Sequence, residues 1–121
     1  GSPQAQLPAI LGPAPTDLII GSKKTMDVFL GTDLDMLLTR ALKVDTLVMT
    51  GINTDTCVLS STLSAVNHGY RAIVISDCVA SNRGKDIHAC ALEIMSRGIA
   101  WVLTVEEFKA KVAAGLSVSA R

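Results

Sequence analysis

The sequence predicts an α/β domain, in which a parallel sheet has helices wound on both of its faces. Short apolar runs alternate with helical patterns along the chain, and each connection between them is short. Hydrophobic residues make up 49% of the chain and aromatic residues only 3%, so the core must consist of Leu, Ile, Val and Ala, as in sheets buried on both faces. A length of 121 residues favours one domain, because it is too short for two independent cores.

The first half of the chain is predicted to contain a lead-in, two strands and a helix. Residues 1–16 hold all four prolines, so we expect an extended lead-in loop without a helix. Residues 17–20 are a short apolar run between turn residues, which predicts a strand. Thr32 suits a helix N-cap, and the apolar spacing after it predicts a helix that ends near Lys43. A second strand is predicted at residues 46–50.

The second half of the chain continues the alternation. A helix that begins near Cys57 and ends at Gly69 leads to a third predicted strand at residues 71–76. A polar loop at residues 77–85 then precedes a helix that Gly98 closes.

The last predicted elements are a strand and a helix. The strand covers residues 99–103. Thr104 and Glu107 have the spacing of a capping box, which predicts a helix from there to Gly115, followed by a frayed tail at residues 116–121. Four strands that alternate with helices favour a parallel sheet with right-handed crossovers.

Charge and cysteine content argue against several classes of function. Lys plus Arg and Asp plus Glu each number 11 without long runs, which leaves no electrostatic footprint for nucleic acid or an anionic membrane. Three cysteines without paired spacing argue against a disulfide framework, so we expect a reducing, cytoplasmic location. No apolar stretch approaches the roughly 20 residues of a membrane span. Zinc-type spacing and a glycine-rich phosphate loop are both missing from the sequence, so we expect no metal and no cofactor.

Cys57 is the candidate nucleophile, because it lies where a predicted buried strand turns into a helix. Ligands gather at the carboxyl ends of parallel strands, and Lys23 and Asp77 are predicted to fall at that same edge. The N–H groups and the dipole of a first helical turn favour the thiolate. The N–H groups of Asn53 and Cys57 could also hold an oxygen that becomes negative during attack on a carbonyl. From position alone, a small apolar residue at the top of a core helix explains Cys57 equally well.

Other residues have weaker claims to a catalytic role. From spacing alone, Lys23 is better explained as a solvated lysine, although in the crevice it would stabilise the thiolate. Cys78 is predicted to end a strand that no helix follows, and Cys90 is expected to pack in the core. A pairing of cysteine with His68 or His88 is available, but neither histidine falls at the carboxyl end of a strand.

Residues 51–57 read Gly-Ile-Asn-Thr-Asp-Thr-Cys and resemble the signature of the isochorismatase-like cysteine hydrolases. In that signature a strand is followed by Gly, an aliphatic residue, a Thr-containing loop and Cys. Lys23 with residues 29–34 looks like the family's lysine segment, and residues 69–77 look like the strand after the nucleophile helix. Residues 88–92 fit the helix that comes next, so the resemblance covers nearly the whole chain.

The resemblance implies a Rossmann-like, three-layer α/β/α fold and a hydrolase that cleaves a C–N bond of a small amide, ureido or carbamoyl compound. Cys57 would be the nucleophile of an Asp-Lys-Cys triad and would form an acyl-enzyme, with Lys23 supporting the thiolate. The N–H groups of Asn53 and Cys57 would form the oxyanion hole, and the peptide bond between Ile52 and Asn53 would be cis. Phe29 is expected to wall the substrate pocket. Oligomers are common in the family, so we expect a homo-oligomer.

One part of the family pattern is absent from residues 1–121. The acidic member of the triad belongs to an earlier first strand, and Asp17 precedes its own predicted strand, so the acid stays unassigned. In the family, the missing part would also contain two strands. These would lie centrally in the sheet, between the strand at residues 17–20 and the strand at residues 46–50. We therefore expect one domain that lacks its N-terminal strands and associates through apolar edges, with itself or with the missing segment. The alternative is a non-catalytic or truncated family member that serves as an oligomerisation or binding module.

Overall fold

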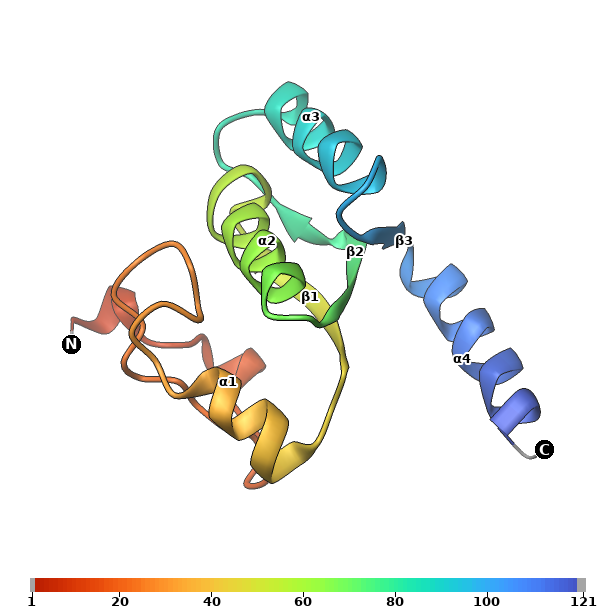
Figure 1. Ribbon diagram of the computed structural model, residues 1–121. Coiled ribbons are helices and arrows are strands. Elements are labelled where there is room, and N and C mark those ends of the chain that lie inside the picture. Colours follow the sequence, from red (N-terminus) through yellow and green to blue (C-terminus); the bar gives the residue numbers. More distant parts are fainter. Residues whose placement is uncertain (1, 120–121) are drawn as a thin grey trace.

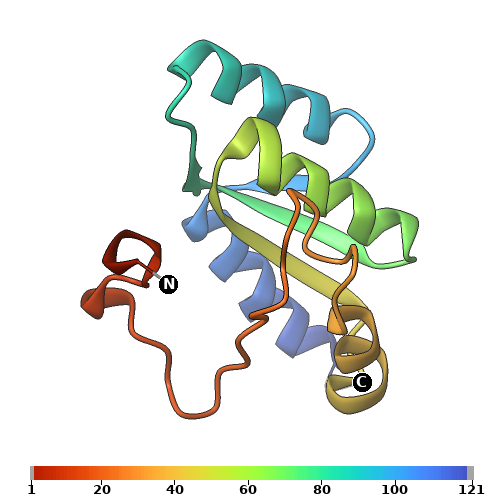
Figure 2. The ribbon, with the colours of Figure 1, turned by 90° about the vertical axis from the view of Figure 1, so that its left-hand side faces the viewer.

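A parallel sheet in the order β1-β2-β3 forms the centre of the structure. This computed structural model describes residues 2–119, and its strands are β1 (Thr46–Ile52), β2 (Arg71–Ala80) and β3 (Trp101–Leu103). Helices α2 (Leu59–Asn67) and α3 (Lys85–Ser96) lie on one face of the sheet, and α4 (Val105–Ser119) lies on the other (Figures 1 and 2). The predicted α/β class, with a parallel sheet between helical layers, is therefore confirmed.

The predicted strand at residues 17–20 is wrong. This segment has no regular structure, and Leu18 and Ile19 are 58% and 68% exposed. A strand needs a neighbour to satisfy its backbone hydrogen bonds, and no described strand lies beside this segment. The described sheet consequently has three strands where the sequence predicted four.

Strand β2 is four residues longer than the predicted 71–76. Its pairing with β1 shifts register, from Met49 opposite Val74 to Gly51 opposite Val79, so β2 has extra residues between the two pairs. Polar Asp77 suggested a loop, yet the bulged strand continues through it to Ala80. The bulge brings the end of β2 level with the end of β1.

The lead-in contains two isolated 3₁₀ turns, η1 (Pro3–Ala5) and η2 (Ala9–Leu11), within otherwise irregular chain. The apolar side chains Ile10 and Leu11 of η2 are exposed at 92% and 66%. Gly1, the first residue of the predicted lead-in, lies outside the described residues.

The predicted helix after Thr32 is confirmed as α1 (Leu34–Met36), which continues into the π-helical segment η3 (Leu37–Leu42). The N-cap is Asp33, one residue after the predicted Thr32, and the Thr32 hydroxyl accepts a hydrogen bond from the Leu34 N–H at 3.3 Å. Lys43 ends the segment in the left-handed conformation.

The capping box of α4 is also confirmed. The Glu107 N–H donates to the Thr104 hydroxyl at 3.2 Å, and the Thr104 N–H donates to the Glu107 carboxylate at 3.4 Å. The assigned helix ends at Ser119, the fraying predicted from residue 116 stays a prediction, and residues 120–121 lie outside the described range.

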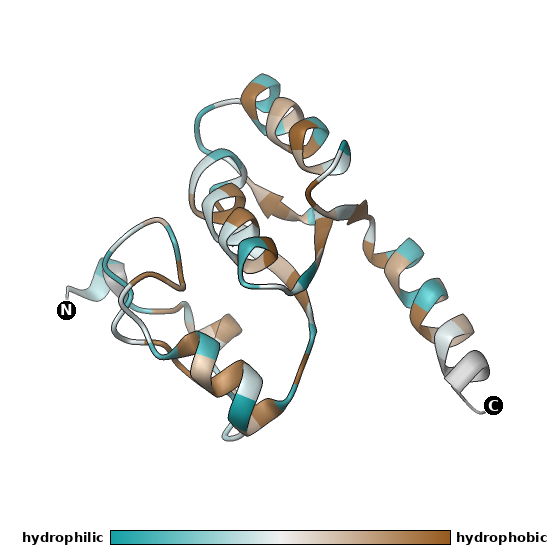
Figure 3. Cartoon of the chain, in the orientation of Figure 1, coloured by the Kyte–Doolittle hydropathy of each residue, from teal (hydrophilic) through white to brown (hydrophobic). Residues whose placement is uncertain are grey.

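The core has two parts. One joins α2 to the segment before β1 and contains Phe29, Leu38, Ala65 and Tyr70. The other lies between the sheet and its helices and contains Val58, Val74, Val79 and Met95. Figure 3 shows the strands mostly in the apolar colours, as expected for a sheet covered on both faces. No helix within residues 2–119 has the length and apolarity needed to cross a bilayer.

Candidate active site

The turn between β1 and α2 positions Cys57. We call residues 53–58 the nucleophile turn: Asn53 caps the π-helical segment η4 (Thr54–Val58), which runs directly into α2. The N–H groups of Thr56 and Val58 both donate to the Asn53 carbonyl oxygen at 3.1 Å. Cys57 therefore lies in the first turn of a continuous helical run at the carboxyl end of a parallel strand.

The backbone that enters this turn has two special conformations. The peptide bond between Ile52 and Asn53 is cis, as the resemblance implies. Gly51 has a φ of 114°, which a residue with a Cβ rarely adopts. Glycine is thus required where β1 bends into the nucleophile turn.

Cys57 is half-buried and has a free thiol. The other two cysteines are also free, and both are exposed. Cys90 was expected to pack in the core, but it faces solvent and the buried positions of α3 are Ala91 and Met95. Cys78 lies within β2 and does not end it.

Lys23 lies on an exposed loop that α2 holds in place. Ser61 of α2 accepts a hydrogen bond from the Val28 N–H at 3.0 Å and donates one to the Met26 carbonyl oxygen at 3.2 Å. Figure 2 shows this orange loop alongside α2. The Lys23 ammonium itself donates to the Thr25 carbonyl oxygen at 2.6 Å. Pairing of Lys23 with Cys57 therefore stays a prediction.

Phe29 is 5% exposed and lies in the core. Its ring stacks on His68 with a centroid distance of 4.7 Å and lies 5.8 Å from the ring of Tyr70. Phe29 also belongs to the core cluster of Leu38 and Ala65, and its role as a pocket wall stays a prediction.

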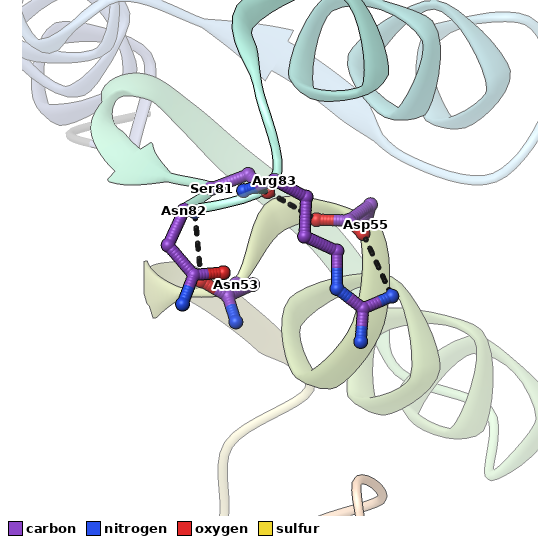
Figure 4. Close-up of polar contacts among 5 residues, drawn as sticks. All are labelled: Asn53, Asp55, Ser81, Asn82 and Arg83. Carbon is purple, nitrogen blue, oxygen red and sulfur yellow. Dashed lines mark hydrogen bonds and ion pairs between the residues drawn. The ribbon is translucent and has the colours of Figure 1, made fainter.

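A polar network on the other side of the nucleophile turn was missed from the sequence. The Ser81 hydroxyl donates to Asp55 Oδ1 at 2.6 Å, and Arg83 Nη1 lies 3.4 Å from Asp55 Oδ2 (Figure 4). The Asn82 N–H donates to Asn53 Oδ1 at 3.3 Å. The sequence held one signal for this network, the polar run at residues 77–85 after the third predicted strand. Which of these residues reach the nucleophile turn depends on the bulge in β2, which the sequence did not reveal.

The network holds Asp55 ionised. The hydrogen bond from Ser81 lowers the pKa of Asp55 below its usual 3.8 and outweighs the opposing effect of burial. The charges of Arg83 and His88 lower this pKa further. Asp55 is therefore a carboxylate at neutral pH.

His88 joins the nucleophile turn to α3. Its Nδ1 shares a hydrogen bond of 2.7 Å with the hydroxyl of Thr54, which is fully buried. A small hollow of about 150 Å³ lies beside this pair, lined by Val79, Ala80, Ser81, Gly84, Lys85 and His88. Cys57 does not line it, so this hollow is not by itself a substrate pocket.

A larger cleft of about 600 Å³ lies at the opposite end of the sheet. It is lined by residues that begin the strands, among them Thr46, Arg71 and Trp101. We place the candidate site at the nucleophile turn despite the greater size of this cleft, because the reactive groups follow the carboxyl ends of the strands. Among residues 2–119, no three His, Cys, Asp or Glu side chains gather in a way that could hold a metal ion.

Comparison with known proteins supports the resemblance seen at residues 51–57. Residues 1–107 match the isochorismatase domain. The chain belongs to the isochorismatase family. Among its curated relatives is the maleamate amidohydrolase of Pseudomonas putida, which is 35% identical over 92 residues, covering 76% of this chain and 42% of the relative. A ureidoacrylate amidohydrolase of Methylobacterium radiotolerans is 35% identical over 99 residues, covering 82% and 38%.

Solved structures of the isochorismatase family share the fold. An isochorismatase-like hydrolase from Alkaliphilus metalliredigens matches with a TM-score of 0.85 and 30% identity, covering 92% of this chain and 60% of that one. A nicotinamidase from Staphylococcus aureus matches with a TM-score of 0.64 and 36% identity, covering 68% and 50%. The chain spans about two fifths of the length of the two curated relatives, 42% and 38%.

Proposed function

We propose that this isochorismatase-family protein is a cysteine-dependent amidohydrolase that cleaves a C–N bond of a small amide, ureido or carbamoyl compound. The observation that carries the proposal is the position of half-buried Cys57 in the first turn of a helical run that follows a parallel strand. Two relatives named as amidohydrolases support this reaction class. The three free cysteines support a reducing, cytoplasmic location.

The proposed reaction is acyl transfer through Cys57. Its thiolate attacks the carbonyl carbon, and the N–H groups of Asn53 and Cys57 hold the oxyanion of the tetrahedral intermediate. The C–N bond then breaks, the amine or ammonia leaves with a proton, and a thioester remains on the sulfur. Water attacks the thioester, releases a carboxylic or carbamic acid and restores the thiol. Lys23 supports the thiolate in this proposal, and the residue that supplies the proton is unassigned.

Replacement of the nucleophile tests the proposal directly. In the native protein, Cys57→Ala should lower turnover by about a thousandfold or more, because alanine has no sulfur on which the proposed thioester could form. Ammonia release from a panel of small amides, ureido acids and carbamoyl compounds measures it. Cys90→Ala, which removes an exposed free cysteine of α3, is the matched control and should leave turnover unchanged. Full activity of the Cys57 variant would end the proposal.

The second candidate is a non-catalytic or truncated family member that serves as an oligomerisation or binding module. The exposed apolar residues of β1 favour it. Iodoacetamide separates the two, since an activated Cys57 reacts faster than Cys78 and Cys90 near neutral pH. Equal reactivity of all three thiols would favour the binding module.

A further inference from the structure

Three consecutive residues after β2 each contact the nucleophile turn. The hydroxyl of Ser81, the backbone N–H of Asn82 and the guanidinium of Arg83 all reach residues 53–55 (Figure 4). They can do so because β1 and β2 end level, with Ile52 opposite Ala80. The segment that leaves β2 therefore runs alongside the turn that leaves β1.

Asp55 is the centre of these contacts. Its side chain is only 5% exposed, whereas that of Arg83 is 61% exposed. Each carboxylate oxygen has its own partner, and the Ser81 hydroxyl that donates to Asp55 also accepts from the Arg83 N–H at 3.1 Å. A buried carboxylate without these partners would be costly, so the arrangement fixes where Asp55 and its neighbours in the turn can lie.

Two further contacts fix the ends of the same turn. Asn53, whose side chain bonds to Asn82, is also the residue whose carbonyl oxygen receives the Thr56 and Val58 N–H groups on either side of Cys57. From α3, His88 holds the Thr54 hydroxyl at 2.7 Å. Every residue of the turn from Asn53 to Asp55 is thus bonded through its side chain to the segment between β2 and α3 or to α3 itself.

We propose that residues 81–83 are a positioning clamp for the catalytic turn, in which Ser81 and Arg83 hold Asp55, and Asn82 holds Asn53, so that the Cys57 sulfur keeps its attacking position. This inference rests on the proposed function. Displacement of a nucleophile by about 1 Å can cost a hundredfold in rate, so loss of the clamp affects the chemical step more than substrate binding. Ser81, Asn82 and Arg83 are positioning residues, because they act through the turn.

Ser81→Ala is the direct test, with Ser81→Thr as the conservative variant that keeps the hydroxyl. In the native protein, Ser81→Ala should lower kcat about ten- to a hundredfold with KM changed less than about threefold. Ser81→Thr should keep most of the native kcat. Asp55→Asn provides a second route, since it keeps the size of the side chain and removes its charge. Arg97→Gln is the matched control, because it breaks the exposed ion pair of Arg97 with Glu93 on α3, away from the turn.

Two readouts separate positioning from general destabilisation. Hydrogen exchange at the Thr56 and Val58 amides should speed up about tenfold in Ser81→Ala and stay unchanged in Arg97→Gln. Iodoacetamide labelling of Cys57, measured relative to exposed Cys90 in the same chain, should fall by a similar factor. General unfolding would instead speed up exchange at amides throughout the chain, and Cys57 and Cys90 would then be labelled at equal rates.

Unchanged exchange at both amides in folded Ser81→Ala and Asp55→Asn would overturn the inference. Faster exchange with unchanged Cys57 labelling and unchanged kcat would overturn it too, because the clamp would then not position the sulfur. Failure of the proposed function looks different: in the native protein Cys57 would react no faster than Cys90, and Cys57→Ala would keep its turnover.

Discussion

Tyr70 lies buried under the helical segment before β1, where its hydroxyl donates a hydrogen bond of 2.6 Å to the Asp35 carboxylate. Burial, and then this hydrogen bond, raise the pKa of Tyr70 from 10.0 to about 12. The folded state therefore holds the phenolic proton more tightly than the unfolded state does. The contribution of this proton to stability is complete below pH 10 and is lost as the pH rises toward 12.

Tyr70→Phe should remove this alkaline sensitivity. At pH 7 we expect the free energy of unfolding to fall by about 1–2 kcal/mol, because Asp35 loses its donor. Between pH 10 and 12 the native protein should lose stability more steeply than the variant does. Denaturant titrations at pH 7, 10 and 11 measure both effects. The same alkaline slope in both proteins would show that Tyr70 is not the group that titrates.

Single residues differ in how far the sequence could place them. The position of Cys57 follows from local signals, namely an apolar run, a glycine and capping-type residues, and the structure places it as predicted. The partners of Asp55 do not follow from such signals, because Ser81 reaches it only after β2 has bulged past Asp77. Phe29 shows a related difficulty, since nothing local to it indicates that Tyr70 and His68 stack beside it.

The helix α4 shows how a local signal can determine an element. It begins at the reciprocal bonds between Thr104 and Glu107, and the Val105 N–H also donates to the Asp77 carboxylate at 3.0 Å. These contacts satisfy N–H groups that a first helical turn otherwise leaves free. Helix α4 contacts β2 and β3 of the sheet, and these bonds fix where it begins.

Thr104→Ala should destabilise the start of α4 by about 1 kcal/mol, because the Glu107 N–H loses its acceptor. Hydrogen exchange of the Glu107 and Phe108 amides, together with denaturant titration, measures the loss. Thr39→Ala is the matched control: the Thr39 hydroxyl bonds back to the Asp35 carbonyl oxygen inside its own helix, where such a bond adds little. An equal effect of the two substitutions would contradict a capping role.

Elements were predictable where their own residues determine them. The helices after Thr32 and Thr104 have clear periodicity and capping residues. The strands that became β1 and β3 are short apolar runs. Residues 17–20 carry a strand signal equally well, but a strand also requires a neighbour, and that requirement is not local. The length of β2 depends likewise on its partner β1, whose register shift keeps residues 77–80 in the sheet.

At the scale of the whole molecule, β1 forms one edge of the described sheet. Its residues Val48 and Ile52 are 45% and 70% exposed, and Leu18 and Ile19 of the preceding segment are exposed as well. An open edge with apolar side chains offers backbone groups to another strand. This exposure supports the proposal that the chain associates, with a second copy or with a segment from the same protein.

A chain of residues 1–121 is therefore expected to self-associate in sedimentation at micromolar concentration. Val48→Lys should weaken this association, because a charge on an edge strand opposes pairing. Val112→Lys is a matched control, since Val112 on α4 has the same 45% exposure but no free strand edge. A monodisperse monomer that unfolds cooperatively would contradict the prediction.

The single tryptophan gives the molecule an internal fluorophore in a useful place. Trp101 begins β3, borders the larger cleft, is 63% exposed and has the Lys111 ammonium 5.4 Å from its ring centre. Trp101 pairs with Ile73, which pairs with Val48, so Trp101 lies four residues, or about 13 Å along the strand direction, from the Ile52 end of β1 that leads to the thiol. The emission of Trp101 should consequently stay unchanged when a ligand binds at the Cys57 sulfur. It should shift to the blue when a macromolecule covers the amino ends of the strands.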